Sequence, residues 1–171
     1  DEVLKNFGIG YADDEWDSLY RYFKEKGVEE KILLELGLIS ESKGKYYDKF
    51  RNRVMFPIIN TAGRVIGFGG RAIGDAQPKY LNSPENKVFQ KKNNLYALNI
   101  CKQDIGRQNS AILVEGYMDV ISLYQAGVRN AIASLGTALT ENQARLIKRY
   151  TKNVILSYDA DQARRKAAMR G

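Results

Sequence analysis

The stretch AILVEGYMDV, residues 111–120, ends a short apolar run with an acidic residue and a glycine. Residues 111–114 follow a polar segment and have the length and composition of a buried strand. Glu115 then stands at the carboxyl end of that strand, and Asp119 follows four residues later. In parallel sheets the carboxyl ends of the strands line the crevice that binds ligands. The stretch therefore predicts a strand that carries a functional carboxylate.

Downstream of this strand the pattern alternates regularly between strands and helices. We expect strand 111–115, helix 117–126, strand 130–136, helix 141–150 and strand 153–161. Thr140 is a suitable N-cap for the second helix. Connections this short between successive strands require right-handed crossovers, so the segment predicts a parallel α/β sheet.

Upstream, residues 13–39 have the spacing of amphipathic helices, with glycines as stop signals. We assign Trp16 and Phe23 to the core on this spacing. The runs RVMFPII and RVIGFGGRAI, joined by NTAG, predict a β-hairpin. Pro57 indicates that the first of these strands lies at an edge or carries a bulge.

After the hairpin the sequence becomes polar and then helical again. Residues 74–94 contain two prolines and predict a long loop, which in a compact domain is usually functional or mobile. The segment LYALNICKQDI, residues 95–105, predicts a helix that leads into the strand at 111.

The net charge of +7 is unevenly distributed along the 171 residues. Residues 1–40 carry a balance of −5, residues 41–109 a balance of +8, and residues 110–171 a balance of +4. A basic block of this kind favours a polyanionic partner, because each neutralised phosphate releases a counterion. A solvated Lys/Arg surface without a partner is the alternative, and charge alone does not decide between them.

Other features of the composition exclude whole classes of chemistry. The chain has no histidine, so proton transfer falls to carboxylates, Lys, Tyr or metal-bound water. Cys101 is the single cysteine, which excludes an internal disulfide and a cysteine-rich metal site. No apolar run approaches the length of a membrane span, and no leader resembles a signal peptide, so we expect an intracellular, cytoplasmic protein without a membrane partner.

The carboxylates at the predicted strand ends form the candidate site. Asp159 and Asp161 follow the strand that starts near 153, and alternate side chains of an extended segment share a face. Together with Glu115 they would repel one another strongly unless a cation lies among them. Mg²⁺ takes oxygen ligands and binds substrate phosphates, and two such ions can assist a phosphoryl displacement. Each carboxylate alone could equally cap a helix or pair with a lysine.

The arrangement of Glu-Gly after one strand and Asp-x-Asp after a later one resembles the toprim domain of topoisomerases and bacterial primases. Longer strings narrow the resemblance. RNRVMFPI, GRVIGFGGR, PKYLNSPE, LYAL, VEGYMDV, ASLGTALT and YDAD are similar, in this order, to the RNA-polymerase core of the bacterial DnaG-type primase. They spread over residues 51–161, whereas residues 1–50 fit the helical lead-in of that family more loosely.

The resemblance implies a fold of two parts. An α+β N-terminal basic subdomain over residues 1–108 precedes an α/β toprim domain with a parallel sheet over residues 109–171. The implied activity is metal-dependent, DNA-templated synthesis of short RNA primers for replication. The chain stops before the family's second Asp-x-Asp, so we expect the toprim domain to be truncated at its C-terminal end and the fragment to be weakly active or inactive alone.

The resemblance also assigns residues. Glu115, Asp159 and Asp161 would be catalytic and bind the metal ions, with Asp119 as a further ligand. The residues implied for template and nucleotide binding are Arg51, Arg53, Arg71, Lys79, Tyr80, Asn82 and Lys91. Arg164 stands where the family carries a glycine, which affects the geometry expected beside Asp161.

The implied cofactor is Mg²⁺, for which Mn²⁺ can substitute, with zinc expected only in an N-terminal module that precedes this core. The implied partners are single-stranded DNA, ribonucleoside triphosphates and, through a C-terminal domain outside this chain, the replicative helicase. Two alternatives stay open. One is another toprim enzyme, a nuclease or topoisomerase, and the other is a single-strand-binding protein without catalysis.

Overall fold

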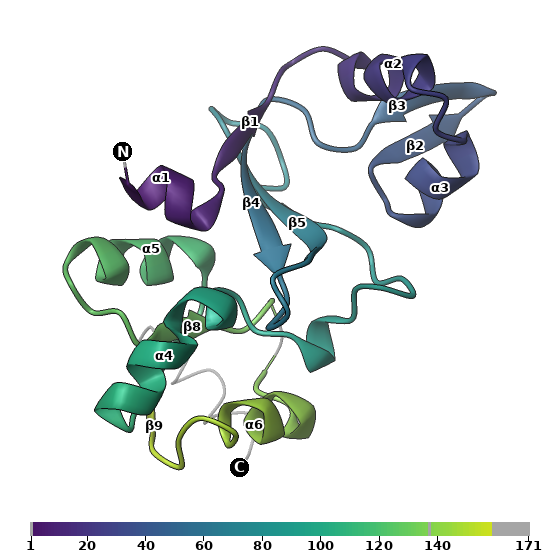
Figure 1. The fold of residues 1–171 in the computed structure, drawn as a ribbon. Coiled ribbons are helices and arrows are strands. Elements are labelled where there is room, and N and C mark those ends of the chain that lie inside the picture. The colour runs from purple at the N-terminus through teal and green to yellow at the C-terminus, as the bar shows by residue number, and fades with distance from the viewer. Residues whose placement is uncertain (1, 137, 159–171) are drawn as a thin grey trace, which may run out of the picture. The chain divides into compact units, whose positions relative to one another are not determined.

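The described part of the chain forms two compact units (Figure 1). The structure, a computed structural model, describes residues 2–136 and 138–158. The first unit comprises Asp1–Ile58 and Val65–Gln90, and the second comprises Ile59–Arg64 and Lys91–Gly171. The chain therefore crosses between the units at three points. The predicted boundary after residue 108 remains a prediction.

The first unit contains a four-stranded sheet in the order β1-β4-β5-β6. Its strands are β1 (Gly10–Ala12), β4 (Arg53–Ile59), β5 (Val65–Ala72) and β6 (Tyr80–Asn82), preceded by helix α1 (Glu2–Phe7). Strands β4 and β5 are joined by the predicted turn, in which the Asn60 amide donates to the Arg64 carbonyl at 3.0 Å. Strand β6 was not predicted, because its three residues lie inside the polar segment after the hairpin.

Pro57 lies in an inner strand of this sheet. Strand β4 has β1 on one side and β5 on the other, but β1 pairs only with residues 53–55. Pro57 is therefore beyond the end of the β1 ladder, where the missing N–H leaves no ladder bond unmade. The edge predicted for the whole strand exists only at this end of it.

The remaining elements of the first unit are two helices and a hairpin, which lie side by side in Figure 1. They are α2 (Ser18–Glu25), α3 (Glu30–Glu35), β2 (Ile39–Ser42) and β3 (Lys45–Asp48). The two strands pair antiparallel. Two helices were predicted in this region, but the first begins at Ser18, because the Asn52 amide donates to the Asp13 carbonyl at 2.7 Å and holds the preceding segment out of the helix.

The assignment of Trp16 to the core is wrong. Trp16 lies in the non-helical segment before α2 and its side chain is 65% exposed. The helical spacing that motivated the assignment does not exist there, since the helix starts two residues later. Phe23, which is within α2, is half-buried.

The second unit confirms the predicted parallel sheet. Its order is β8-β7-β9, and β7 pairs in parallel with both neighbours. The elements are η1 (Lys91–Asn93), α4 (Leu98–Gln108), β7 (Ala111–Val114), α5 (Tyr117–Gln125), β8 (Ala131–Ala133), α6 (Glu141–Ile147) and β9 (Val154–Leu156). Helix α4 starts later than predicted, because Tyr96 forms an antiparallel bridge with Ala133 instead.

The core of the second unit is made by apolar residues from each layer. Leu113 of β7, Ile132 of β8, Ile105 of α4 and Ile147 of α6 are fully buried. The predicted cap at Thr140 is present, and its hydroxyl accepts the Gln143 amide at 3.2 Å. Within the described ranges, no helix has the length and apolar content needed to cross a bilayer.

Candidate functional site

The carboxyl ends of β7 and β9 meet at one edge of the sheet in the second unit. Glu115 follows β7 and is half-buried, while Ser157 and Tyr158 follow β9. The Ser157 amide donates to the Leu113 carbonyl at 2.9 Å, which continues the ladder to this edge. A hollow of about 350 Å³ is lined there by Glu115, Asp119, Ser157 and Tyr158 among others. The structure thus brings Glu115 beside the segment that leads into Asp159.

Asp119 has a structural task at this edge. It is the third residue of α5, and its Oδ2 accepts the Gly116 amide at 3.0 Å. This bond satisfies an amide at the start of the helix that would otherwise lack an intrahelical partner. Asp119 is exposed and lines the same hollow as Glu115, so a carboxylate oxygen at the helix start also faces that space.

The described residues supply part of a metal-binding donor set. Within residues 2–136 and 138–158, no three His, Cys, Asp or Glu side chains converge. Glu115 and Asp119 are the two carboxylates in the hollow, and Asp159, Asp161 and Arg164 lie outside the described residues. The pKa of Tyr158 is raised, first by burial and then by the negative charge of Glu115. Carboxylate and hydroxyl oxygens facing one hollow fit a hard cation such as Mg²⁺.

Four of the residues predicted to bind nucleic acid lie in strands β5 and β6 of the first unit or directly before β6. Arg71 pairs with Tyr80 and Gly69 pairs with Asn82 across the two strands. The Arg71 guanidinium lies 6.0 Å from the centre of the Tyr80 ring, which is 44% exposed. Arg71 and Lys79 line a hollow of about 430 Å³. Two cations beside an exposed ring are suited to a phosphate and a base.

Arg53 is placed differently from the other basic residues. Its side chain lies in the buried part of β4, with 6% of the residue exposed. Its Nη1 donates to the Pro78 carbonyl at 2.9 Å. Burial, and to a smaller extent the charge of Arg51, lowers the pKa of Arg53. This geometry favours a structural task, namely holding the loop before β6 against β4.

Lys91 belongs to the second unit and is held by helix α6. The Gln143 side chain is fully buried, and its Nε2 donates at 2.9 Å both to the Lys91 carbonyl and to the Asn94 carbonyl. The Thr140 hydroxyl donates to the Lys92 carbonyl at 2.7 Å. The backbone that carries Lys91 is therefore fixed, while its side chain is half-buried.

Trp16 and Arg51 form a stack that the sequence analysis did not predict. The Arg51 guanidinium lies 4.2 Å from the centre of the exposed Trp16 ring and 5.5 Å from the Tyr47 ring. Trp16 and Tyr47 meet edge to face at 5.9 Å. The sequence does carry a signal for this, since DDEWD surrounds the tryptophan with acidic residues, which is unusual for a buried ring. An exposed aromatic ring with a cation is a typical base-stacking surface.

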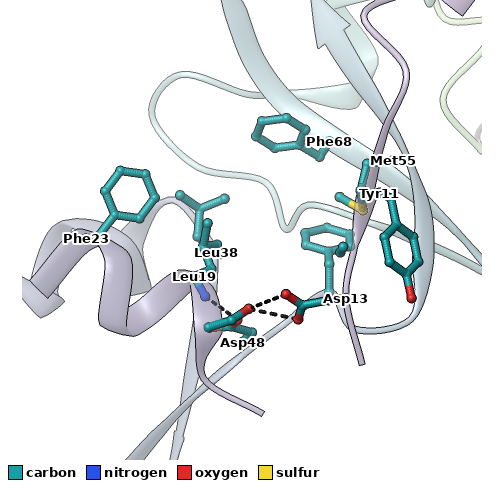
Figure 2. A pocket seen from close by; sticks show the side chains of 11 residues that line it. Tyr11, Asp13, Leu19, Phe23, Leu38, Asp48, Met55 and Phe68 are labelled. Carbon is teal, nitrogen blue, oxygen red and sulfur yellow. Dashed lines mark hydrogen bonds between the residues drawn. The ribbon is translucent and has the colours of Figure 1, made fainter. Parts of the chain in front are cut away.

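The first unit also has an apolar hollow of about 450 Å³ (Figure 2). Its apolar lining includes Phe23, Leu38, Met55 and Phe68, and its polar lining includes Asp13, Ser18 and Asp48. The Ser18 hydroxyl lies 2.8 Å from Asp13 Oδ1 and 3.4 Å from Asp48 Oδ2. The Ser18 hydroxyl thus bridges the two carboxylates and fixes this side of the hollow.

Comparison with known proteins identifies the family. Residues 1–102 match the model for the N-terminal domain of the DNA primase catalytic core, and residues 112–171 match the Toprim-like model. The chain belongs to the bacterial DnaG-type primase family. It is 53% identical over 171 residues to the DNA primase of Clostridium acetobutylicum. The aligned region covers 99% of this chain and 28% of that relative.

Other primases give the same result. The DNA primase of Escherichia coli K12 is 47% identical over 170 residues, with 99% of this chain and 29% of the relative covered. The solved catalytic core of the E. coli primase superposes with a TM-score of 0.90 at 46% identity, over 99% of this chain and 54% of that structure. A DnaG catalytic domain bound to single-stranded DNA superposes with a TM-score of 0.89 at 46% identity, over 99% and 55%. The chain thus spans less than a third of these curated relatives.

Proposed function

We propose that this primase-family chain takes part in DNA-templated synthesis of short RNA primers, with ribonucleoside triphosphates as substrates and single-stranded DNA as template. The observation that carries the proposal is the meeting of the β7 and β9 carboxyl ends, which places Glu115 beside the segment leading into Asp159. The primase relatives and the DNA bound to one related structure support it.

In the proposed site, Glu115, Asp159 and Asp161 hold Mg²⁺, or Mn²⁺ in its place, and Asp119 contributes a further oxygen. When bound, the metal supplies a Lewis acid for phosphoryl transfer. The chain has no histidine, so its own share is to present carboxylates at the sheet edge and to position phosphates with lysine and arginine.

The template is proposed to contact two surfaces of the first unit. Arg71, Lys79, Tyr80 and Asn82 form one, and the Trp16–Arg51 stack forms the other. Lys91 of the second unit is proposed to contact nucleotide or template. Such a reaction takes place where bacterial DNA is replicated, in the cytoplasm. Helicase and zinc binding are proposed for other parts of a full-length primase.

The proposal is tested with Glu115→Gln, which removes one charge and keeps the shape of the side chain. The matched control is Glu141→Gln, because Glu141 is an exposed carboxylate of the same unit, paired with Arg145 on α6. Mn²⁺ binding is measured by electron paramagnetic resonance and ribonucleotide incorporation by gel assay.

We expect Glu115→Gln to weaken Mn²⁺ binding at least about tenfold, since it removes one charged ligand of a small set. Any incorporation seen with the unmodified chain should fall with it, while Glu141→Gln behaves like the unmodified chain. Equal Mn²⁺ binding by both variants would contradict the metal assignment. DNA cleavage in place of incorporation would favour the nuclease alternative, and DNA binding independent of metal and nucleotide would favour the single-strand-binding protein.

A further inference from the structure

Asp48 ends strand β3, is almost fully buried and caps a helix from another part of the unit (Figure 2). Its Oδ2 accepts the Leu19 amide at 2.7 Å and its Oδ1 accepts the Tyr20 amide at 2.9 Å. Asp17, the residue at the N-cap position of α2, makes no side-chain cap bond. Asp48 therefore satisfies amides that the helix start leaves open.

The backbone of Asp48 contacts both members of the exposed stack. Its amide donates to the Trp16 carbonyl at 2.7 Å. Its carbonyl accepts a hydrogen bond from Nη1 of Arg51. Asp48 thus fixes the backbone that carries the Trp16 ring, the guanidinium that covers this ring, and the helix that follows it.

The exposed stack depends on this fixation, because little else covers it. Trp16 is 65% exposed, so packing against the core cannot set the orientation of its ring. The ring is bounded by Arg51 at 4.2 Å and by the edge of Tyr47. A base can stack on such a platform with useful affinity only if the ring is already held in place, since ordering it on binding would cost conformational entropy.

We propose that Asp48 is a positioning residue for single-stranded DNA, which holds the Trp16–Arg51 stack in the orientation that accepts a base. This inference rests on the proposed function, in which the stack contacts template. Asp48 itself does not touch DNA. Its loss should therefore change affinity through Trp16 and not through charge.

An electrostatic role and a positioning role of Asp48 predict opposite changes in DNA affinity for Asp48→Asn. Removing a negative charge near a DNA-binding surface should strengthen binding by simple electrostatics. Replacing one carboxylate oxygen by an NH2 group removes the acceptor of one α2 amide. The substitution should therefore loosen the helix start that follows Trp16 and weaken binding, while the backbone bonds of Asp48 to Trp16 and Arg51 stay in place. Asp14→Asn is the matched control, because it removes the same charge from an exposed aspartate two residues before Trp16 that is not part of the stack.

The chain offers a direct probe, since Trp16 is its one tryptophan. Time-resolved fluorescence anisotropy of Trp16 reports the local mobility of the ring without any DNA. Affinity for an oligothymidylate is measured by titration at fixed salt, and thermal unfolding by circular dichroism confirms that each variant is folded at the assay temperature. Asp48→Glu keeps the charge and displaces the carboxylate by one methylene, and serves as a second variant if Asp48→Asn does not fold.

We expect Asp48→Asn or Asp48→Glu to increase the mobility of Trp16 and to weaken oligothymidylate binding about tenfold, close to the effect of losing one stacked base. Trp16→Ala should have a similar effect, and the double variant should be no weaker than Trp16→Ala, since both changes remove the same platform. Asp14→Asn should bind as well as the unmodified chain or slightly better.

Unchanged mobility of Trp16 in both Asp48 variants would overturn the inference, and so would additive losses in the double variant. Failure of the proposed function is a separate outcome. If Trp16→Ala itself binds DNA like the unmodified chain, the stack is not a template surface, and the claim that Asp48 acts in template binding falls with it even if the anisotropy changes.

Discussion

Arg53 and Lys79 come from the same basic block of the sequence but have different surroundings. Arg53 is buried and bonded to the Pro78 carbonyl, whereas Lys79 is exposed beside Arg71. A buried guanidinium that donates to a carbonyl is less accessible to a phosphate than an exposed ammonium group. The tendency of arginine to bind backbone in a fixed geometry thus separates two residues that charge counting treats alike.

We expect Arg53→Met to lower the free energy of unfolding by about 1.5–3 kcal/mol, the usual worth of a hydrogen bond to a charged group. Lys79→Ala should leave stability within about 0.5 kcal/mol, as exposed substitutions do. Urea unfolding of both variants measures the difference. Equal stability of the two would mean that the Arg53 bonds contribute nothing to the fold.

Asp48 should also make stability depend on pH. Burial is the main cause that raises the pKa of Asp48 above its ordinary 3.8, and the nearby Asp13 charge adds to it, although bonds from Leu19, Tyr20 and Ser18 oppose them. The folded state then holds this proton more tightly than the unfolded state. Stability contributed by protonation grows as pH falls through the raised pKa toward 3.8.

The expected outcome is that the unmodified chain gains stability relative to Asp48→Asn between pH 7 and about pH 4. Urea unfolding of the two proteins at both pH values gives the comparison, and most other titrating groups cancel because they are shared. A stability difference that stays constant, or that moves the other way, would show that the pKa of Asp48 is not raised.

Among the helices and strands, those with strong local patterns were predictable. The β7–α5–β8 alternation and the Thr140 cap follow from apolar runs and capping residues that are contiguous in sequence. The features that were missed depend on distant partners. The amides of Asp48 and Asn52 hold Trp16 and Asp13 out of the helix, and no pattern near Trp16 encodes those bonds. Burial of Arg53 likewise depends on a carbonyl 25 residues away.

The candidate site was likewise predictable only where a local sequence pattern places the residue. Placing Glu115 at a strand end needed only the apolar run before it. The capping bond of Asp119 needed the exact start of α5, and the stack of Arg51 on Trp16 needed the fold of the β2–β3 hairpin. Short-range patterns therefore located the acidic edge, while the aromatic surface required the tertiary structure.

Two glycines that end helices provide an internal comparison. Gly27 after α2 and Gly37 after α3 both have positive φ, of +70° and +65°. A Cβ at Gly37 would lie 2.2 Å from Pro84 Cδ, whereas a Cβ at Gly27 meets nothing within 4 Å. Gly37 thus permits close packing of the loop before Phe89 against the end of α3, whereas Gly27 only permits the turn.

Gly27→Ala should cost about 1 kcal/mol of unfolding free energy for the left-handed backbone. Gly37→Ala should cost about 2–4 kcal/mol, because overpacking against Pro84 adds to the same backbone term. Chemical denaturation of both variants measures the gap. Similar losses would indicate that Pro84 moves aside without cost.

The two surfaces proposed to bind nucleic acid differ in chemical character. The Arg71–Lys79 surface is cationic, and the Trp16–Arg51 stack is largely aromatic. Phosphate contacts release counterions and make affinity salt-dependent, whereas base stacking does so only weakly. Loss of the cationic surface should therefore change the salt dependence of DNA affinity, whereas loss of the aromatic surface should change mainly the affinity itself.

We expect the logarithm of affinity for single-stranded DNA to fall linearly with the logarithm of salt concentration. Lys79→Ala should reduce the slope by about one unit if it contacts one phosphate. Trp16→Ala should lower affinity at every salt concentration and leave the slope nearly unchanged. Filter binding at salt concentrations from about 50 to about 300 mM measures the slope for each variant. Parallel curves for the unmodified chain and Lys79→Ala would remove Lys79 from the template surface.

The chain's three crossings between its units bear on how the protein could be divided. The turn 59–64 is grouped with the second unit although the strands flanking it belong mostly to the first, and Lys102 Nζ donates to the Thr61 carbonyl at 3.0 Å. A cut after Gln90 would therefore leave one fragment still carrying a piece of the other's fold. Fragments 1–90 and 91–171, expressed separately, are thus suitable halves for complementation. In such a pair, fragment 1–90 would supply residues 59–64 to the unit formed by fragment 91–171.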